Sequence, residues 1–251
     1  MRKTCILFIN KSVGKLVAKT LIKAEQVNVK AVYIVDVKNT VDEELENLLE
    51  KHKVLTGIGS SCNTDGMLEQ IGEVDFFISV YWPHLIDGKC LKYARDTINF
   101  HPALLPKNRG WYPHVHNIID QSTPGVSLHR IAEKVDGGDI WVQKTVEIKS
   151  TDLASDLHSR LMSNIYELFE ENWKSIFFGR IKAVPQDQGQ ANYKSKYYFD
   201  KLDLLDLTET VKVGDFLRFL RARSLEERGF AHFLDEEGDK VYINLRLSKE
   251  T

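Results

Sequence analysis

Apolar positions in the first third of the chain follow two different spacings. Residues 5–9 and 31–35 are short, nearly continuous apolar runs, which are typical of buried strands. Residues 13–24 and 41–51, between and after these runs, repeat apolar positions at helical spacing. This alternation predicts parallel strands joined by crossover helices.

The run VDFFISV at residues 74–80 follows a further helical pattern at residues 65–71. Its continuous apolar character fits a central strand that is covered on both faces. The next strand is expected near residues 97–100. Because open α/β sheets bind ligands beyond the carboxyl ends of their strands, the residues after this strand are expected to face a site.

The pattern changes after residue 124. Residues 125–131 and 140–148 resemble two strands joined by the turn KVDGGD. A long helical pattern then starts at Ser150 or Thr151 and runs to about Phe178. Its apolar stripe predicts a core or subunit-interface helix.

From residue 192 onward the chain is more polar and irregular. A helix is expected near residues 213–222 and a hairpin around residues 235–239. We therefore predict an α/β, Rossmann-like, mainly parallel sheet with flanking helices and a small carboxy-terminal appendage. The expected division is a catalytic domain at residues 1–185 and a subdomain at residues 186–251.

Composition and charge exclude several classes of protein. The 251 residues are 43% hydrophobic and 28% charged, which fits a folded domain and not a disordered chain. The net charge of −2 disfavours nucleic acid as a partner held through its phosphates. The segment from Tyr193 on is also balanced, with 11 basic and 12 acidic residues, so it is not expected to be a basic arm.

The three cysteines are far apart and form no CxxC pair, which favours neither a disulfide framework nor a zinc site. A reduced, cytoplasmic location is expected. The start MRKTCILFIN fits a buried strand better than a signal peptide. We find no apolar run long enough to span a bilayer, so no membrane partner is expected.

The stretch INFHPALLPKNRGWYPHVHN concentrates polar and aromatic residues at the predicted end of a strand. On an extended segment Asn99 and His101 point to the same side, and Pro102 disfavours helical geometry at His101. An imidazole can take a proton and an amide can donate to a developing oxyanion. The alternative is that His101 is a hydrogen-bonded structural histidine. Its pairing with Asn99 disfavours that alternative.

A third candidate lies in the turn KVDGGD. Taken alone, DGG is a common turn. A carboxylate brought against His101, however, would orient its ring and stabilise its protonated form. Asp136 is the preferred candidate for this role, while Asp139 is expected to cap or solvate the turn.

These motifs together resemble the folate-dependent formyltransferases. The resemblance is carried by Asn99-x-His101-Pro102, Leu105-Pro106, Arg109-Gly110, GVSLHR and VDGGDIWVQ, over roughly residues 1–185. It implies catalysis by Asn99, His101 and Asp136, with N10-formyltetrahydrofolate as the formyl donor and an amine as the acceptor. No metal is expected.

The segment SVYWPHLI, after the predicted central strand, is similar to the pterin-binding segment of that family. The resemblance implies that the donor is bound by the following residues: Tyr81, Trp82, His84, Leu85, Ile86 and Val135. The alternative for the aromatic members is that they are half-buried loop residues.

The run NRGWYPH is similar to the acceptor loop of enzymes that formylate nucleotide-linked amino sugars. An arginine can hold a diphosphate, and an indole or phenol ring can cover a base or sugar. The expected acceptor-binding residues are Lys107, Asn108, Arg109, Gly110, Trp111 and Tyr112. The alternatives are solvated charges for Lys107 and Arg109 and a packing role for the ring of Trp111. A solvated charge is favoured for Lys107 and not for Arg109. The rings at residues 197–199 are candidates for contact with either the nucleotide or a second subunit, and the sequence does not separate these two options.

The resemblance implies a sugar N-formyltransferase acting on a dTDP-linked 3- or 4-amino dideoxy sugar, such as dTDP-4-amino-4,6-dideoxyglucose, for lipopolysaccharide O-antigen synthesis. A homodimer is also implied. The alternatives are formylation of methionyl-tRNA or glycinamide ribonucleotide, and a catalytically silent binding module of the same fold. A nicotinamide dehydrogenase is disfavoured because the pair Gly57-x-Gly59 lacks the third glycine of a dinucleotide fingerprint.

Overall fold

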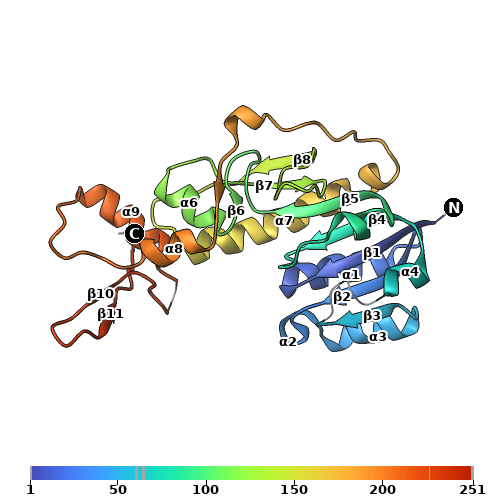
Figure 1. Ribbon diagram of the computed structural model, residues 1–251, viewed down its shortest axis with the longest axis horizontal. Coiled ribbons are helices and arrows are strands. Elements are labelled where there is room, and N and C mark those ends of the chain that lie inside the picture. The colour runs from blue at the N-terminus through green and yellow to red at the C-terminus, as the bar shows by residue number, and fades with distance from the viewer. Residues whose placement is uncertain (1, 60–61, 64–65, 226, 250–251) are drawn as a thin grey trace. The chain divides into compact units, whose positions relative to one another are not determined.

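The central feature of the chain is a seven-stranded sheet in the order β3-β2-β1-β4-β5-β7-β8. The computed structural model describes residues 2–59, 62–63, 66–225 and 227–249 (Figure 1). The strands of this sheet are β1 (Lys3–Ile9), β2 (Val27–Ile34), β3 (Leu55–Ile58), β4 (Val74–Val80), β5 (Ala94–His101), β7 (Gly125–His129) and β8 (Ile140–Thr145). The register pairs from β3 to β5 are all parallel. The predicted α/β class with a mainly parallel sheet is confirmed.

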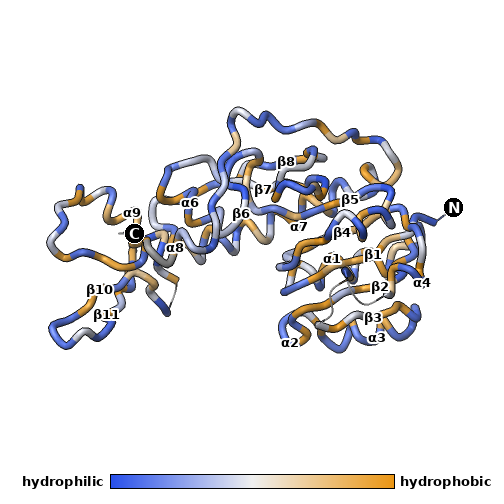
Figure 2. The backbone as a smooth tube through the Cα atoms, in the orientation of Figure 1, coloured by the Kyte–Doolittle hydropathy of each residue, from blue (hydrophilic) through white to orange (hydrophobic). Residues whose placement is uncertain are grey.

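Strands β1 and β4 pair at the middle of the sheet and carry hydrophobic runs (Figure 2). The last five residues of each strand are buried, as expected for strands that are covered on both faces. Helix α1 (Lys11–Lys23) starts directly after β1. A Cβ atom on Gly14 would lie 2.8 Å from Cβ of Ile9, so this glycine permits the close approach of helix and strand.

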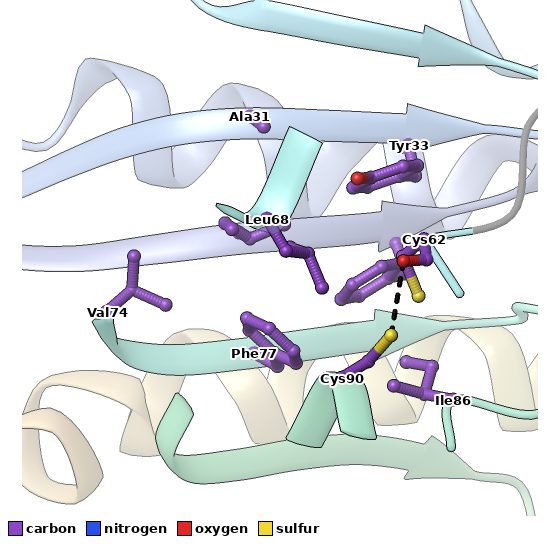
Figure 3. Close-up of a cluster of buried hydrophobic side chains, with 10 residues drawn as sticks. Ala31, Tyr33, Cys62, Leu68, Val74, Phe77, Ile86 and Cys90 are labelled. Carbon is purple, nitrogen blue, oxygen red and sulfur yellow. Dashed lines mark hydrogen bonds between the residues drawn. The ribbon is translucent and has the colours of Figure 1, made fainter. Parts of the chain in front are cut away.

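Aromatic rings contribute to the packing of the sheet. Phe8 of β1 stacks on Tyr33 of β2 with ring centroids 5.0 Å apart, within a cluster of buried side chains (Figure 3). Phe76 of β4 stacks on Phe177 of the long helix α7 (Ala154–Phe177) at 4.4 Å. Four shorter helices complete this part of the chain: α2 (Val37–Thr40), α3 (Glu43–Lys51), α4 (Met67–Ile71) and α5 (Gly88–Leu91).

The remaining elements are short. Strand β6 (Arg109–Gly110) pairs in parallel with β9 (Tyr193–Lys194), and β10 (His232–Leu234) forms a hairpin with β11 (Lys240–Tyr242). The helices are α6 (Pro113–Ile119), η1 (Gln188–Gln190), α8 (Tyr197–Leu202) and α9 (Val213–Ala222). Helices α6 and α9 contact each other.

Two compact units are each assembled from separate stretches of the chain. The first comprises Met1–His101, Leu128–Val142 and Ile165–Pro185. The second comprises Pro102–Ser127, Gln143–Asn164 and Gln186–Thr251. The last change between units falls at residue 185, and the division into domains at residues 1–185 and 186–251 stays a prediction. Within the described ranges, no helix combines the length and apolar character that crossing a membrane requires.

Several element boundaries differ from the sequence-based expectation. The long helix starts at Ala154, and before it Asp152 accepts from the backbone N–H of Lys149 while Asp156 accepts from that of Leu153. These side chains satisfy backbone donors ahead of the helix, as capping carboxylates do. The helix predicted from Asp65 begins at Met67, after Gly66, whose φ of 69° is not helical; Asp65 itself lies outside the described residues.

Candidate active site

Asn99 and His101 lie at the carboxyl end of strand β5 in the first unit. They alternate with Phe100, so both side chains project from the same face of the strand. Phe100 turns to the opposite face, where its ring lies 5.2 Å from that of Phe169 on α7. The local sequence thus separates a polar pair from a core residue, as predicted.

Asp136 reaches the same place from the loop between β7 and β8. One of its carboxylate oxygens, Oδ2, lies 3.4 Å from Nδ1 of His101. The other, Oδ1, accepts a long hydrogen bond of 3.4 Å from Nδ2 of Asn99. The side chains of His101 and Asp136 are only 5% and 11% exposed, so their interaction is weakly screened by water. The structure therefore brings together the amide, the imidazole and the carboxylate that the motifs predicted.

His129, the last residue of β7, is a fourth member of this cluster that the sequence analysis did not identify. Its Nδ1 lies 2.7 Å from the carbonyl oxygen of Arg130, which can only accept, so Nδ1 carries a hydrogen. In the neutral ring Nε2 is then the acceptor, and Nδ2 of Asn99 donates to it over 3.0 Å. The same Nε2 is 3.6 Å from Oδ1 of Asp136. The sequence shows His129 only as the histidine of the motif GVSLHR, on a strand whose residues are all buried, and this pattern does not distinguish a site residue from a core residue.

The loop that carries Asp136 adopts a conformation that few side chains tolerate. Asp136 itself has a φ of 50°, in the left-handed region that aspartate visits more readily than most residues. A Cβ atom on Gly138 would lie 2.1 Å from the carbonyl oxygen of Arg130. A side chain at residue 138 would collide with the backbone of Arg130, so the turn requires glycine there. The turn presents the carboxylate of Asp136 to His101.

The geometry supports general base and oxyanion chemistry. One hydrogen of the Asn99 amide is directed to His129, while the second makes only the long contact with Asp136. That second hydrogen is therefore the weaker bound and can turn to an oxyanion in the transition state. His101 has its Nδ1 next to Asp136, and an imidazole oriented in this way can accept a proton from a substrate through its other ring nitrogen, Nε2.

The predicted donor-binding segment follows β4 in the same unit. Tyr81 has a φ of 56°, and its carbonyl accepts from Nδ2 of Asn10. Trp82 packs its ring against Phe8 and Tyr33, so this indole is partly a core residue. Trp82 therefore has a packing role, and its contact with the folate donor stays a prediction.

The other predicted donor residues divide into exposed and buried side chains. His84, Leu85 and Val135 are exposed, whereas Ile86 belongs to the buried cluster of Figure 3. The side chain of Leu85 is 75% exposed and that of Val135 is 39% exposed. Because Leu85 is exposed and Ile86 is buried, the Ile86 side of the segment faces the core.

The predicted acceptor loop lies in the second unit. Lys107, Trp111 and Tyr112 are exposed, Gly110 is intermediate and Asn108 is buried. Gly110 has a φ of 91°, and a Cβ atom there would lie 2.4 Å from the carbonyl oxygen of Lys194. The loop is thus fastened to β9 through backbone contacts that only glycine permits.

Arg109 does not lie on the surface as a phosphate-binding arginine would. It is only 1% exposed and donates through Nε and Nη2 to Oε1 of Gln186, and through Nη1 to Oε1 of Gln188. These bonds give the guanidinium a structural role within the second unit. Its predicted contact with a diphosphate stays a prediction that this burial does not support.

Aromatic rings and ammonium groups surround the exposed part of this loop. Tyr112 packs edge-on against Phe199 at 5.0 Å, and Nζ of Lys196 lies 5.6 Å from the ring of Trp111. Nζ of Lys194 lies 4.1 Å from the ring of Tyr198. Flat rings with cations beside them suit a nucleobase and its phosphates.

Among the residues that the structure describes, no group of three or more His, Cys, Asp or Glu side chains is arranged to hold a metal ion. The cysteines Cys5, Cys62 and Cys90 are buried and not disulfide-bonded. Burial raises the pKa of the Cys90 thiol to about 11, so it is protonated at neutral pH.

Comparison with known proteins gives matches along the chain. Residues 63–171 match the formyl transferase family, and residues 199–249 match the N-formyltransferase dimerization C-terminal domain. The dTDP-4-amino-4,6-dideoxyglucose formyltransferases of Mycobacterium tuberculosis and Mycobacterium bovis are 37% identical to this chain over 168 residues. The aligned part is 66% of this chain and 68% of theirs.

Solved structures share the fold over nearly the whole chain. A Mycobacterium tuberculosis protein, provisionally described as a sugar N-formyltransferase, superimposes with a TM-score of 0.82 at 26% identity, covering 100% of both chains. An N-formyltransferase from Helicobacter canadensis, in complex with folinic acid and dTDP-3-aminofucose, has a TM-score of 0.67 at 20% identity, covering 90% of this chain and 82% of that one. The latter identity establishes a shared fold, and its ligands are those of that protein.

Proposed function

This chain belongs to the formyl transferase family, and from that premise we propose that it moves a formyl group from N10-formyltetrahydrofolate to the amine of a dTDP-linked amino-dideoxy sugar. The observation that carries the proposal is the convergence of Asn99, His101 and Asp136. A silent binding module has no chemical need for this arrangement. The relatives at 37% identity favour the 4-amino sugar, dTDP-4-amino-4,6-dideoxyglucose, over its 3-amino counterpart.

The roles of the side chains follow from their atoms. The acceptor amine attacks the formyl carbon, and Asn99 Nδ2–H donates to the oxygen that becomes negatively charged. His101 accepts the proton from the attacking nitrogen, and Asp136 orients the imidazole and stabilises its protonated form. The proton then passes to the departing N10 nitrogen of the folate, so the formyl–N10 bond breaks as the new amide forms.

The binding of the two substrates is assigned to separate segments. We place the pterin of the donor at the segment formed by residues 81–86 together with Val135. The nucleotide of the acceptor is assigned to the rings of Trp111 and Tyr112 and to the neighbouring lysines of the second unit. Exposed rings of this kind offer stacking surfaces to a base.

The test is incubation of the protein with N10-formyltetrahydrofolate and a panel of dTDP-, UDP- and GDP-linked amino sugars, with the formamide product measured by mass spectrometry. We expect the fastest turnover with dTDP-4-amino-4,6-dideoxyglucose. Formylation of glycinamide ribonucleotide or methionyl-tRNA, with none of the sugars, would overturn the acceptor assignment. Lipopolysaccharide O-antigen is the proposed destination, tested by loss of the formamido group from the polysaccharide of a deletion strain. The proposed cytoplasmic location is tested by cell fractionation.

A homodimer formed by the carboxy-terminal segment is part of the proposal. The match of residues 199–249 to a dimerization domain supports it, as do exposed apolar side chains on α9. Val213 and Leu217 are 74% and 42% exposed and lie one helical turn apart, on the same face. The double variant V213E/L217E is expected to sediment as a monomer while the wild type sediments as a dimer. As a control, I58E alters an exposed apolar residue of the edge strand β3 and should remain dimeric.

A further inference from the structure

The side chain of Asn63 holds the backbone on both sides of Ile86. Nδ2 of Asn63 donates to the carbonyl oxygen of Leu85 over 2.9 Å. The backbone N–H of Asp87 donates to Oδ1 of Asn63 over 3.2 Å. One carboxamide thus satisfies a carbonyl and the N–H two residues later, which is the pairing that a residue of a parallel strand would make.

The neighbouring residue Cys62 fastens the end of the same segment. Sγ of Cys90 donates to the carbonyl oxygen of Cys62 over 3.1 Å, as the dashed line in Figure 3 shows. The backbone N–H of Cys90 donates to Oδ1 of Asp87 over 2.9 Å. Cys62, Ile86 and Cys90 lie in one buried cluster, so the dipeptide of residues 62–63 ties the segment of residues 85–90 to the core.

We propose that Asn63 is a positioning residue for the folate donor, because it holds the segment around Ile86 in the shape that receives the pterin. This inference rests on the proposed function, which assigns the donor to residues 81–86. Asn63 engages the polar backbone atoms of Leu85 and Asp87 on one side. Asn63 thus pairs with the backbone of the two residues that flank Ile86, and we assign the backbone N–H and C=O of Ile86 itself to the pterin ring.

A fixed segment binds more tightly than a mobile one because its ordering cost is met on folding and not on binding. Loss of Asn63 is therefore expected to act on donor affinity and to leave the chemical step intact. Its side chain does not touch the reacting atoms in this assignment. This separates Asn63 from Asn99, whose loss acts on kcat.

The test compares N63A and N63D with wild type and with the control N39A. Asn39 is also exposed, and its amide donates to Asp36 on the same unit. We expect N63A to raise the KM for N10-formyltetrahydrofolate about tenfold, the size expected for losing two hydrogen bonds. The kcat and the KM for the nucleotide sugar should stay within about twofold of wild type. N63D keeps the acceptor for the Asp87 N–H and lacks the donor for the Leu85 carbonyl. We therefore expect N63D to raise the KM for N10-formyltetrahydrofolate about threefold or more.

Two further readouts do not depend on turnover. Calorimetric titration with 5-formyltetrahydrofolate should show the same loss of affinity in N63A, and the amide of Asp87 should exchange its hydrogen faster in N63A than in N63D or wild type. The inference is overturned by wild-type donor affinity in N63A, or by equal losses for donor, acceptor and kcat. If wild type binds folate and N63A binds it equally well, the role of Asn63 is rejected and the proposed function stands. Failure of wild type to bind folate removes the proposed function and this inference with it.

Discussion

Nδ2 of Asn99 donates to Nε2 of His129 over 3.0 Å, from one strand end to another in the same sheet. The bond depends on the tautomer of His129, whose Nδ1–H donates to the carbonyl of Arg130. The ring of His129 is thereby held as an acceptor, and the Asn99 amide is held with its nitrogen toward the site. A residue that does not appear in the predicted catalytic set thus determines how one of its members is oriented.

Replacing His129 should therefore impair the chemical step. In H129F the ring remains and the acceptor is lost, so the Asn99 amide is no longer oriented by the strand beside it. We expect kcat to fall about tenfold to a hundredfold, corresponding to about 1.4–2.7 kcal/mol in the transition state. The KM for each substrate should change little, as steady-state kinetics can show. The matched control H52F alters an exposed histidine at the end of α3, and equal kcat values in the two variants would argue against this role.

The two carboxylates of the DGGD turn should differ in their effects. D136N removes the charge beside His101, and we expect kcat to fall by about 10²–10⁴, the range for a lost acid–base function. Asp139 instead pairs with Arg130, which also holds Asp96 through two bonds. D139N should leave kcat near wild type and change the free energy of unfolding by less than about 1 kcal/mol. Similar kinetic losses in both variants would mean that the turn as a whole, and not the Asp136 carboxylate, is what matters.

Arg109 offers a choice between a structural and a substrate-binding role. Its guanidinium makes three hydrogen bonds to Gln186 and Gln188 in a buried setting, and a lysine cannot reproduce that planar fork. We expect R109K to lower the free energy of unfolding by about 1–3 kcal/mol in urea titrations. K107A, at an exposed neighbour, should leave stability unchanged. An R109K protein of wild-type stability with a raised KM for the nucleotide sugar would restore the predicted diphosphate contact.

Acid should destabilise the second unit through His116. Burial lowers the pKa of this ring from 6.5 to about 4, against an opposing effect of Asp120 and with Lys194 and Arg223 nearby. Because the folded-state pKa is depressed, the unfolded chain takes up the proton first. The stability that His116 contributes is therefore complete above pH 6.5 and is lost as pH falls from 6.5 toward 4.

The measurement is the free energy of unfolding of wild type and H116F between pH 7 and pH 4. H116F removes the titrating group while keeping a ring beside Tyr198 and Phe199. Wild type should lose up to about 3 kcal/mol more than the variant over this range, from 1.36 kcal/mol per unit of pKa shift. Parallel curves for the two proteins would contradict a buried neutral His116.

Apolar spacing in the sequence predicted most of the central layer, and the motifs together with their family resemblance named three of the site's side chains. Strand β4 and helix α9 were predicted with the bounds that the structure has, because each is a long, consistent pattern of apolar positions. Strand β3 was missed. Its sequence LTGI buries only Gly57, so it gives no apolar run to recognise.

The role of His129 and the burial of Arg109 could not be predicted from local patterns. Each depends on partners far along the chain, which only the folded structure brings together. Asn99 and His129 are 30 residues apart, and Arg109 and Gln186 are 77 apart. An arginine in a loop rich in polar residues has the sequence signature of a phosphate ligand, whether or not two glutamines cover it.

The central claim is that His101 takes the proton of the attacking amine. Its most direct test is single-turnover formyl transfer by H101N with N10-formyltetrahydrofolate and dTDP-4-amino-4,6-dideoxyglucose, alongside calorimetric binding of 5-formyltetrahydrofolate. We predict wild-type binding of the folate and a rate of product formation at least about a hundredfold below wild type. Product formation by H101N at the wild-type rate would contradict the account.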